Sequence, residues 1–141
     1  MTTTTEGATM REITSHRVNP ANDILRITVT DEPGSGGANH RYLIGGFDTS
    51  TNPSDPYQGD VASNVIEVLF QNGPIAEVGV NGVTHEALIA ILIDRLEAFQ
   101  RGPFANAHNA IALHSLQTAQ SALLERTRER MARGVEGTHK V

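Results

Sequence analysis

Largely apolar residues recur at helical spacing between Thr84 and Gly137, the stretch that dominates the pattern of this chain. The first run is Leu88, Ile91, Leu92, Leu96 and Phe99, and the second is Leu113, Leu116, Leu123, Leu124, Thr127 and Met131. Spacings of three and four place each run on one face of a helix. Gly102 and Pro103 separate the runs and end one helix before the next begins. The pattern predicts an antiparallel αα-hairpin.

Capping residues indicate where these helices end. Thr84 follows an Asn-Gly turn and is a good N-cap, and Glu86 lies in the first turn, where a carboxylate favours the helix dipole. Gly134 suits the left-handed position after the second helix. We expect helices over about 84–100 and 105–133, which are roughly 25 and 43 Å long at 1.5 Å per residue. The segment 126–133 should therefore extend beyond the first helix.

Alternating β-branched and polar residues precede the hairpin. They predict strands within 11–18, 24–30, 40–47 and 62–71, and a short extended piece over 75–80. The connections are a Gly-rich hairpin loop at 33–37 and a surface loop at 48–60, with a loose Thr-rich tail at 1–8. Gly45-Gly46 suggests a bulge or a close backbone approach.

The expected fold class is therefore α+β. A small N-terminal antiparallel β-platform, with its mobile N-terminus and the 48–60 loop, occupies residues 1–80. A long C-terminal helical hairpin occupies residues 81–141 and ends in a Gly-Val-Glu-Gly tail.

Composition narrows the class of protein. The 141 residues suffice for one domain, or for a compact domain with a projecting element. The absence of cysteine excludes disulfides, cysteine-bound metals and thiol catalysis, and it fits a reducing cytosol. No stretch supports secretion or membrane insertion. A formal charge of −5 argues against broad, nonspecific binding of nucleic acid, but it is compatible with a small anion held by a local arginine cluster.

Catalytic and metal-binding patterns are incomplete. His85-Glu86 begins a metalloprotease-like motif, but Ile89 stands where the second histidine is required. His108 and His114 diverge on a helix, and no serine has the context of a nucleophile. We expect neither a catalytic residue nor a metal or cofactor, and hence a protein that is not an enzyme.

Three arginines share one stripe of the second helix. Arg126, Arg130 and Arg133 stand at i, i+4 and i+7, and guanidinium forks suit the oxygens of a di- or oligophosphate. The acidic residues Glu125 and Glu129 alternate with them, so ordinary salt bridges on a solvated helix explain the spacing too. Spacing alone favours that simpler interpretation.

The longest diagnostic stretch runs from about residue 64 to 139. It contains an Asn-Gly-Val-Thr helix entry, a Gly-Pro-Phe turn with Asn109 downstream, and the segment RTRERMARGVEG. This composite closely resembles the phage Thoeris anti-defence family, whose helical hairpin is shared with phage proteins that counter the cyclic-oligonucleotide signalling of CBASS.

The resemblance implies a sponge, a protein that sequesters a cyclic nucleotide immune signal in the cytoplasm of the infected bacterium without cleaving it. The implied ligand is a cyclic ADP-ribose isomer, glyco-cyclic ADP-ribose, and some oligomeric members also hold cyclic tri- or dinucleotides at separate sites. By position it implies a ligand-binding set of Phe99, Asn109, Leu123, Arg126 and Arg130, and a second site at Arg133 and Thr138. The arginines would bind phosphate, while Phe99 and Asn109 would contact base or ribose. Phe104 could take the place of Phe99, which could instead pack in the core.

Helix geometry adds an expectation of its own. Asn109 and Arg126 are 17 residues apart on one helix, or about 25 Å, which exceeds the reach of a mononucleotide-sized ligand. A pocket that uses both must draw them from different chains, so geometry predicts at least a homodimer with composite sites, and the resemblance implies a homodimer or a homohexamer. The alternative is a non-catalytic virion or assembly protein that uses the arginines in salt bridges between subunits.

Overall fold

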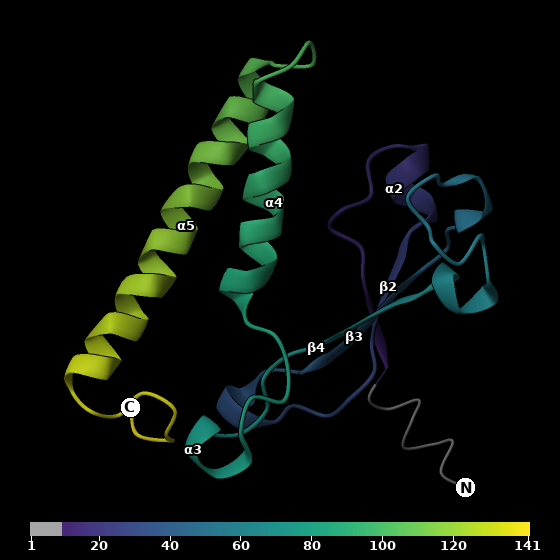
Figure 1. Ribbon diagram of the computed structural model, residues 1–141. Helices are drawn as coiled ribbons and strands as arrows, with labels where there is room; N and C mark the ends of the chain where they lie inside the picture. Colours follow the sequence, from purple (N-terminus) through teal and green to yellow (C-terminus); the bar gives the residue numbers. More distant parts are fainter. Residues whose placement is uncertain (1–9) are drawn as a thin grey trace, which may run out of the picture. The chain divides into compact units, whose positions relative to one another are not determined.

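The computed structural model describes residues 10–141 and has the expected α+β fold (Figure 1). The tail predicted over residues 1–8 lies outside the described residues. The chain forms two compact units, one that ends at Asn72 and one that runs from Gly73 to Val141. The first unit contains a β-sheet and the second contains a helical hairpin.

Four antiparallel strands form the sheet of the first unit in the order β1-β2-β3-β4. They are β1 (Arg11–Ile13), β2 (Arg26–Val29), β3 (Arg41–Gly45) and β4 (Ile66–Leu69). The register pairs Thr28 with Leu43 and Tyr42 with Val68. Val29, which is fully buried, marks the core of this unit.

The strands are shorter than the sequence predicts. β1 stops at Ile13 because the chain turns at Thr14, whose carbonyl accepts a hydrogen bond from the Arg17 amide at 3.1 Å. A short helix, α2 (Pro20–Ile24), then begins with an Asn19 cap and a proline in its first turn, both of which favour a helix start. The prediction of a strand continuing to residue 18 was therefore wrong.

Gly46 brings two backbone segments of the first unit into contact, as the glycine pair predicts. Its φ is 92°, and a Cβ added there would lie 2.0 Å from the carbonyl oxygen of Ile24. Only glycine fits so close to another backbone. The loop after β3 is thereby held next to the end of α2.

The second unit consists of a short helix, α3 (Ile75–Val78), and two long antiparallel helices, α4 (His85–Gln100) and α5 (Ala107–Ala132) (Figure 1). The expectation of an extended piece over 75–80 was wrong, because Pro74 starts a single helical turn that Gly79 closes with a φ of 74°. The caps of the hairpin agree with prediction. The Thr84 hydroxyl accepts from the Ala87 amide at 3.1 Å, and Gly134 has a φ of 73°.

The contact between α4 and α5 uses only part of the apolar surface that the sequence offers. On α4 the buried residue is Ile93, whereas Ile91, Leu92 and Phe99 are 58%, 48% and 40% exposed. These three residues belong to the run that the sequence places on one face, and they remain largely exposed. α4 carries two apolar stripes, and a single neighbouring helix can bury only one of them.

On α5 the partly buried residues follow a regular alternation of four and three, which places them on one face of the helix. They are Asn109, Leu113, Leu116, Gln120, Leu123, Thr127 and Arg130. Met131, assigned to this stripe from the sequence, is 63% exposed. Arg130 therefore occupies the last partly buried position of the helix.

Candidate functional site

The turn between α4 and α5 carries an aromatic pair. Phe99 and Phe104 meet edge to face with ring centroids 6.5 Å apart, and the Arg95 guanidinium lies 5.7 Å from the Phe99 ring centroid. Phe104 is 70% exposed. The ring of Phe99 is thus neither buried in a core nor isolated, and both rings present surface on which a base could stack.

The same turn is fastened by amide hydrogen bonds. Gln100 bonds the Asn106 backbone twice, through its Nε2 to the carbonyl and its Oε1 to the amide, each at 3.1 Å. Asn106 in turn caps α5, because its Oδ1 accepts from the Asn109 amide at 2.8 Å. These contacts hold Asn109 in the first turn of α5, close to the aromatic pair.

The opposite end of α5 carries the arginines. Arg126 is exposed, and among residues 10–141 no carboxylate pairs with it. Arg128 pairs instead with Glu125 at 3.1 Å, where both side chains are open to solvent. Arg126 is thus available to an external anion.

Arg130 has a different environment, since its side chain is only 19% exposed. The Nε donates to the Glu136 carboxylate at 3.0 Å, and Nη1 donates to the Lys140 carbonyl at 2.8 Å. The Nη2 donates to the carbonyls of Val135 and Thr138 at 3.0 and 3.2 Å. We call residues 134–141 the C-terminal strap, because this segment folds back over Arg130.

The two residues expected at a second site also belong to the strap network. Arg133 is exposed and donates to the Val141 carbonyl, and the Thr138 hydroxyl donates to the Val135 carbonyl at 2.5 Å. Leu123, from the first set, is half-buried on the partly buried face of α5. In this structure these three side chains contribute to the fold of the hairpin unit.

The expected ligand-binding residues therefore form two groups. Phe99 and Asn109 lie at the turn, whereas Arg126 and Arg130 lie at the far end of α5, roughly 25 and 32 Å from Asn109 along the helix. The structure does not bring these groups together within one chain.

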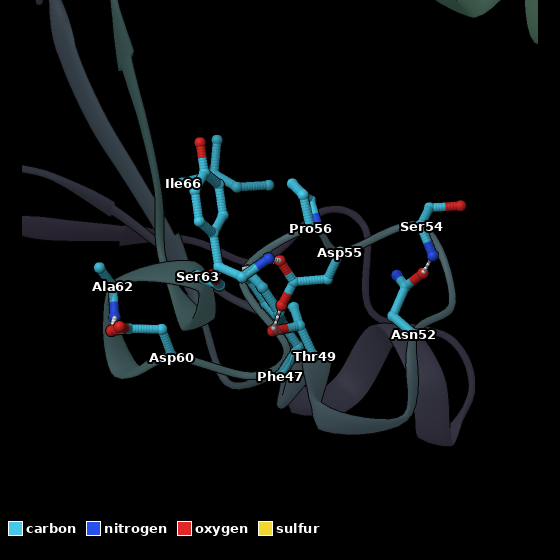
Figure 2. A pocket seen from close by; sticks show the side chains of 11 residues that line it. Phe47, Thr49, Asn52, Ser54, Asp55, Pro56, Asp60, Ala62, Ser63 and Ile66 are labelled. Atoms are coloured by element: carbon cyan, nitrogen blue, oxygen red, sulfur yellow. Dashed lines mark hydrogen bonds between the residues drawn. The ribbon is translucent and has the colours of Figure 1, made fainter.

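The first unit contains a separate hollow of about 510 Å³ in the loop between β3 and β4 (Figure 2). Its wall includes Phe47, Pro56, Tyr57 and Ile66. The polar side chains shown there are engaged in local bonds: Asn52 accepts from the Ser54 amide at 2.9 Å and Asp60 from the Ala62 amide at 3.0 Å. The hollow is thus a product of how the loop folds.

Asp55 is the centre of that loop. Its carboxylate accepts from the Thr49 hydroxyl at 2.7 Å and from the backbone amides of Gly59 and Tyr57, each at 2.8 Å. These bonds, above all the one from Thr49, favour the ionised carboxyl and hold the pKa of Asp55 below its ordinary value of 3.8. The 48–60 segment, expected as a surface loop, is thus organised by one carboxylate.

Known proteins resemble this chain mainly in its helical hairpin. Residues 62–128 match the family model of the Acb2/Tad1 hairpin domain. Residues 62–128 are therefore similar to an Acb2/Tad1 hairpin domain. It is also 49% identical over 80 residues to Thoeris anti-defense 1 from Bacillus phage SBSphiJ7, across 57% of this chain and 56% of that relative. The family resemblance recognised in the sequence is confirmed, and the match spans little more than half of the relative's length.

The Acb2/Tad1 hairpin match includes β4, α4 and most of α5, with Phe99, Asn109, Leu123 and Arg126. Arg130 and the strap lie beyond it. The sequence analysis did not identify Glu136 as a partner of Arg130. The available signal was an acidic residue shortly after a helix that ends in arginines.

Within residues 10–141 no helix has the length and apolar character needed to cross a bilayer. The same residues contain no group of three histidine or acidic side chains suited to hold a metal ion.

Proposed function

We propose that this protein is a phage anti-defence protein that binds a cyclic nucleotide immune signal and sequesters it without cleavage. The observation that carries the proposal is the 49% identity to Thoeris anti-defense 1, together with the Acb2/Tad1 hairpin domain. The proposed ligand is glyco-cyclic ADP-ribose, with cyclic tri- or dinucleotides at separate sites, and the place of action is the infected host cell.

The chemistry of the hairpin supports an anionic, aromatic ligand. Arg126 offers an unpaired fork of donors for phosphate oxygens, and Phe99 and Phe104 offer exposed rings for a base. Because these groups lie at opposite ends of one hairpin, we propose that the pocket forms between two chains packed antiparallel. The turn of one chain would then meet the arginine end of the other.

The exposed apolar stripe of α4 supports such an assembly. Ile91, Leu92 and Phe99 remain 40–58% exposed after α4 has packed on α5. A second copy that covers this stripe would bury the apolar surface and enclose the ligand, and enclosure slows release by excluding water and requiring the pocket to open.

Sequestration is distinguished from catalysis by recovery of the ligand. The protein is incubated with glyco-cyclic ADP-ribose, freed of unbound ligand and denatured by heat, and the released nucleotide is identified by mass spectrometry. We expect intact glyco-cyclic ADP-ribose. Recovery of an altered product would indicate an enzyme, and no retention would favour the assembly-protein interpretation.

Arg126→Ala should weaken the binding of glyco-cyclic ADP-ribose by about 2 kcal/mol or more, or roughly 30-fold, because it leaves buried phosphate charge without a partner. Isothermal titration calorimetry measures the change. The matched control is Arg128→Ala, which removes an arginine that pairs with Glu125 in solvent. Equal affinities of the two variants would contradict the role assigned to Arg126.

A further inference from the structure

The chain reverses direction at the C-terminal end of α5 and folds back over Arg130. The Val135 amide donates to the Arg130 carbonyl at 3.0 Å and the Gly134 amide donates to the Met131 carbonyl at 3.0 Å. With Gly134 in the left-handed region, these bonds form a Schellman motif that reverses the chain. The reversal buries Val135, which is 8% exposed, and starts the C-terminal strap.

The strap is anchored at points other than Arg130. The Gly137 carbonyl accepts from the Ala76 amide of α3 at 3.2 Å, and the Thr138 amide donates to the Val135 carbonyl at 3.1 Å. The Arg133 guanidinium donates a hydrogen bond to the Val141 carbonyl in the strap. The strap is thus an ordered part of the hairpin unit.

Oxygen atoms of the strap surround the Arg130 guanidinium as a bound anion would. A guanidinium has five N–H donors, and here Nε, Nη1 and Nη2 all donate to strap oxygens. One of these acceptors, the Glu136 carboxylate, is negatively charged, as a phosphate is. Four of the five N–H donors are therefore engaged, so a phosphate group cannot bind Arg130 through two parallel hydrogen bonds while the strap is closed.

We propose that Glu136 and the C-terminal strap are an internal competitor for the anion site, so that a phosphate-bearing ligand engages Arg130 only by displacing Glu136. This inference rests on the proposed function, because it takes Arg130 as a phosphate ligand. It divides the arginines into two classes. Arg126 is open to a ligand at all times, whereas Arg130 becomes available only when the strap opens.

Glu136→Gln tests the competitor directly. Glutamine keeps an oxygen that can accept from Arg130 but removes the charge, and a hydrogen bond to a neutral acceptor is weaker. With inorganic pyrophosphate as the probe, we expect the variant to bind roughly fivefold more tightly than the wild type. The matched control is Glu125→Gln, which removes a carboxylate from the same end of α5 without touching Arg130, and it should change affinity less than about twofold.

Hydrogen exchange follows the strap itself. Saturating pyrophosphate should speed exchange of the Val135 and Thr138 amides in the wild-type protein, because the closed strap protects both of them. Unchanged protection with bound pyrophosphate would overturn the proposal. So would a Glu136→Gln variant that binds no more tightly than the wild type.

The results also separate this inference from the function on which it rests. In one outcome the protein binds glyco-cyclic ADP-ribose and pyrophosphate, Glu136→Gln does not change the affinity, and the strap amides stay protected. This outcome would contradict the competitor role of Glu136 but would leave the proposed function intact. Failure of both the wild type and Glu136→Gln to bind either probe would overturn both. Binding by Glu136→Gln but not by the wild type would support a closed strap most directly.

Discussion

Arg126 and Arg130 have identical side chains and stand one helical turn apart, but α5 presents them to different surroundings. Arg126 points into solvent with no carboxylate partner among residues 10–141. Arg130 is four-fifths covered and donates to four oxygens of the strap. Their contributions to anion binding should differ accordingly, since a new partner of Arg130 must replace existing bonds.

A carboxylate in the first unit gives a residue-scale prediction about pH. The pKa of Asp55 is lower in the folded loop than its ordinary value of 3.8, so its bonds stabilise the loop fully above that value. This stabilisation is lost as the pH falls through the lower, folded pKa. NMR titration of the Gly59 and Tyr57 amide protons should show a midpoint below 3.8.

Asp55→Asn should abolish this titration, whereas Asp94→Asn, on an exposed face of α4, should leave it unchanged. A midpoint at or above 3.8 in the wild-type protein would show that the carboxylate does not organise the loop.

The helical spacing of the arginines could be predicted because a helix relates positions within a few turns by a fixed rotation. The partners of Arg130 could not, since Glu136, Thr138 and Lys140 come after Gly134, where the chain leaves the helix. Beyond a left-handed residue, periodicity says nothing about which side chains meet.

At the scale of elements, α4 explains which part of the fold the sequence could and could not determine. Its cap at Thr84 and its end before Gly102 are local signals, and both were predicted correctly. Its buried face was not, because apolar residues occupy two stripes and their spacing does not say which stripe meets α5. The helical turn of α3 was missed for a related reason, since four residues are too few to show a period.

Side-chain truncation should affect the stability of the chain differently on the two apolar stripes of α4, the buried one with Ile93 and the exposed one with Ile91. Ile93→Ala should lower the free energy of unfolding by about 2 kcal/mol or more, because it opens a cavity between α4 and α5. Ile91→Ala, at 58% exposure, should change it by less than about 0.5 kcal/mol in dilute, dissociated chains.

Urea unfolding compares the two variants, and sedimentation measures their self-association. In an assembly that covers the outer stripe, Ile91→Ala weakens association while leaving the isolated chain stable. Equal losses of stability in the two variants would show that both stripes are packed within one chain.

At the scale of the whole molecule, the ends of the hairpin carry complementary parts of one proposed pocket. The turn supplies aromatic rings and the far end of α5 supplies cations, in a chain whose formal charge is −5. The arginines are thus a local positive region on an acidic protein, and their attraction for an anion should weaken with added salt.

Mixing two defective variants tests whether the pocket is shared. Phe99→Ala and Arg126→Ala chains, refolded together, should form mixed dimers in which one of the two pockets is intact. Random pairing restores about a quarter of all sites, counted by calorimetry with glyco-cyclic ADP-ribose. Each variant refolded alone is the control.

No recovery on mixing, or a particle of one chain's mass in light scattering that binds the nucleotide tightly, would contradict a shared pocket.

The exposed position of Phe104 is suited to a fluorescence probe of the turn between α4 and α5. The chain has no tryptophan, and its two tyrosines, Tyr42 and Tyr57, both belong to the sheet unit. A Phe104→Trp variant would place a unique indole beside Phe99, at 70% exposure in the parent residue. Its emission would then shift to the blue whenever a nucleotide or a neighbouring chain covers the turn, with no tryptophan emission from the rest of the protein.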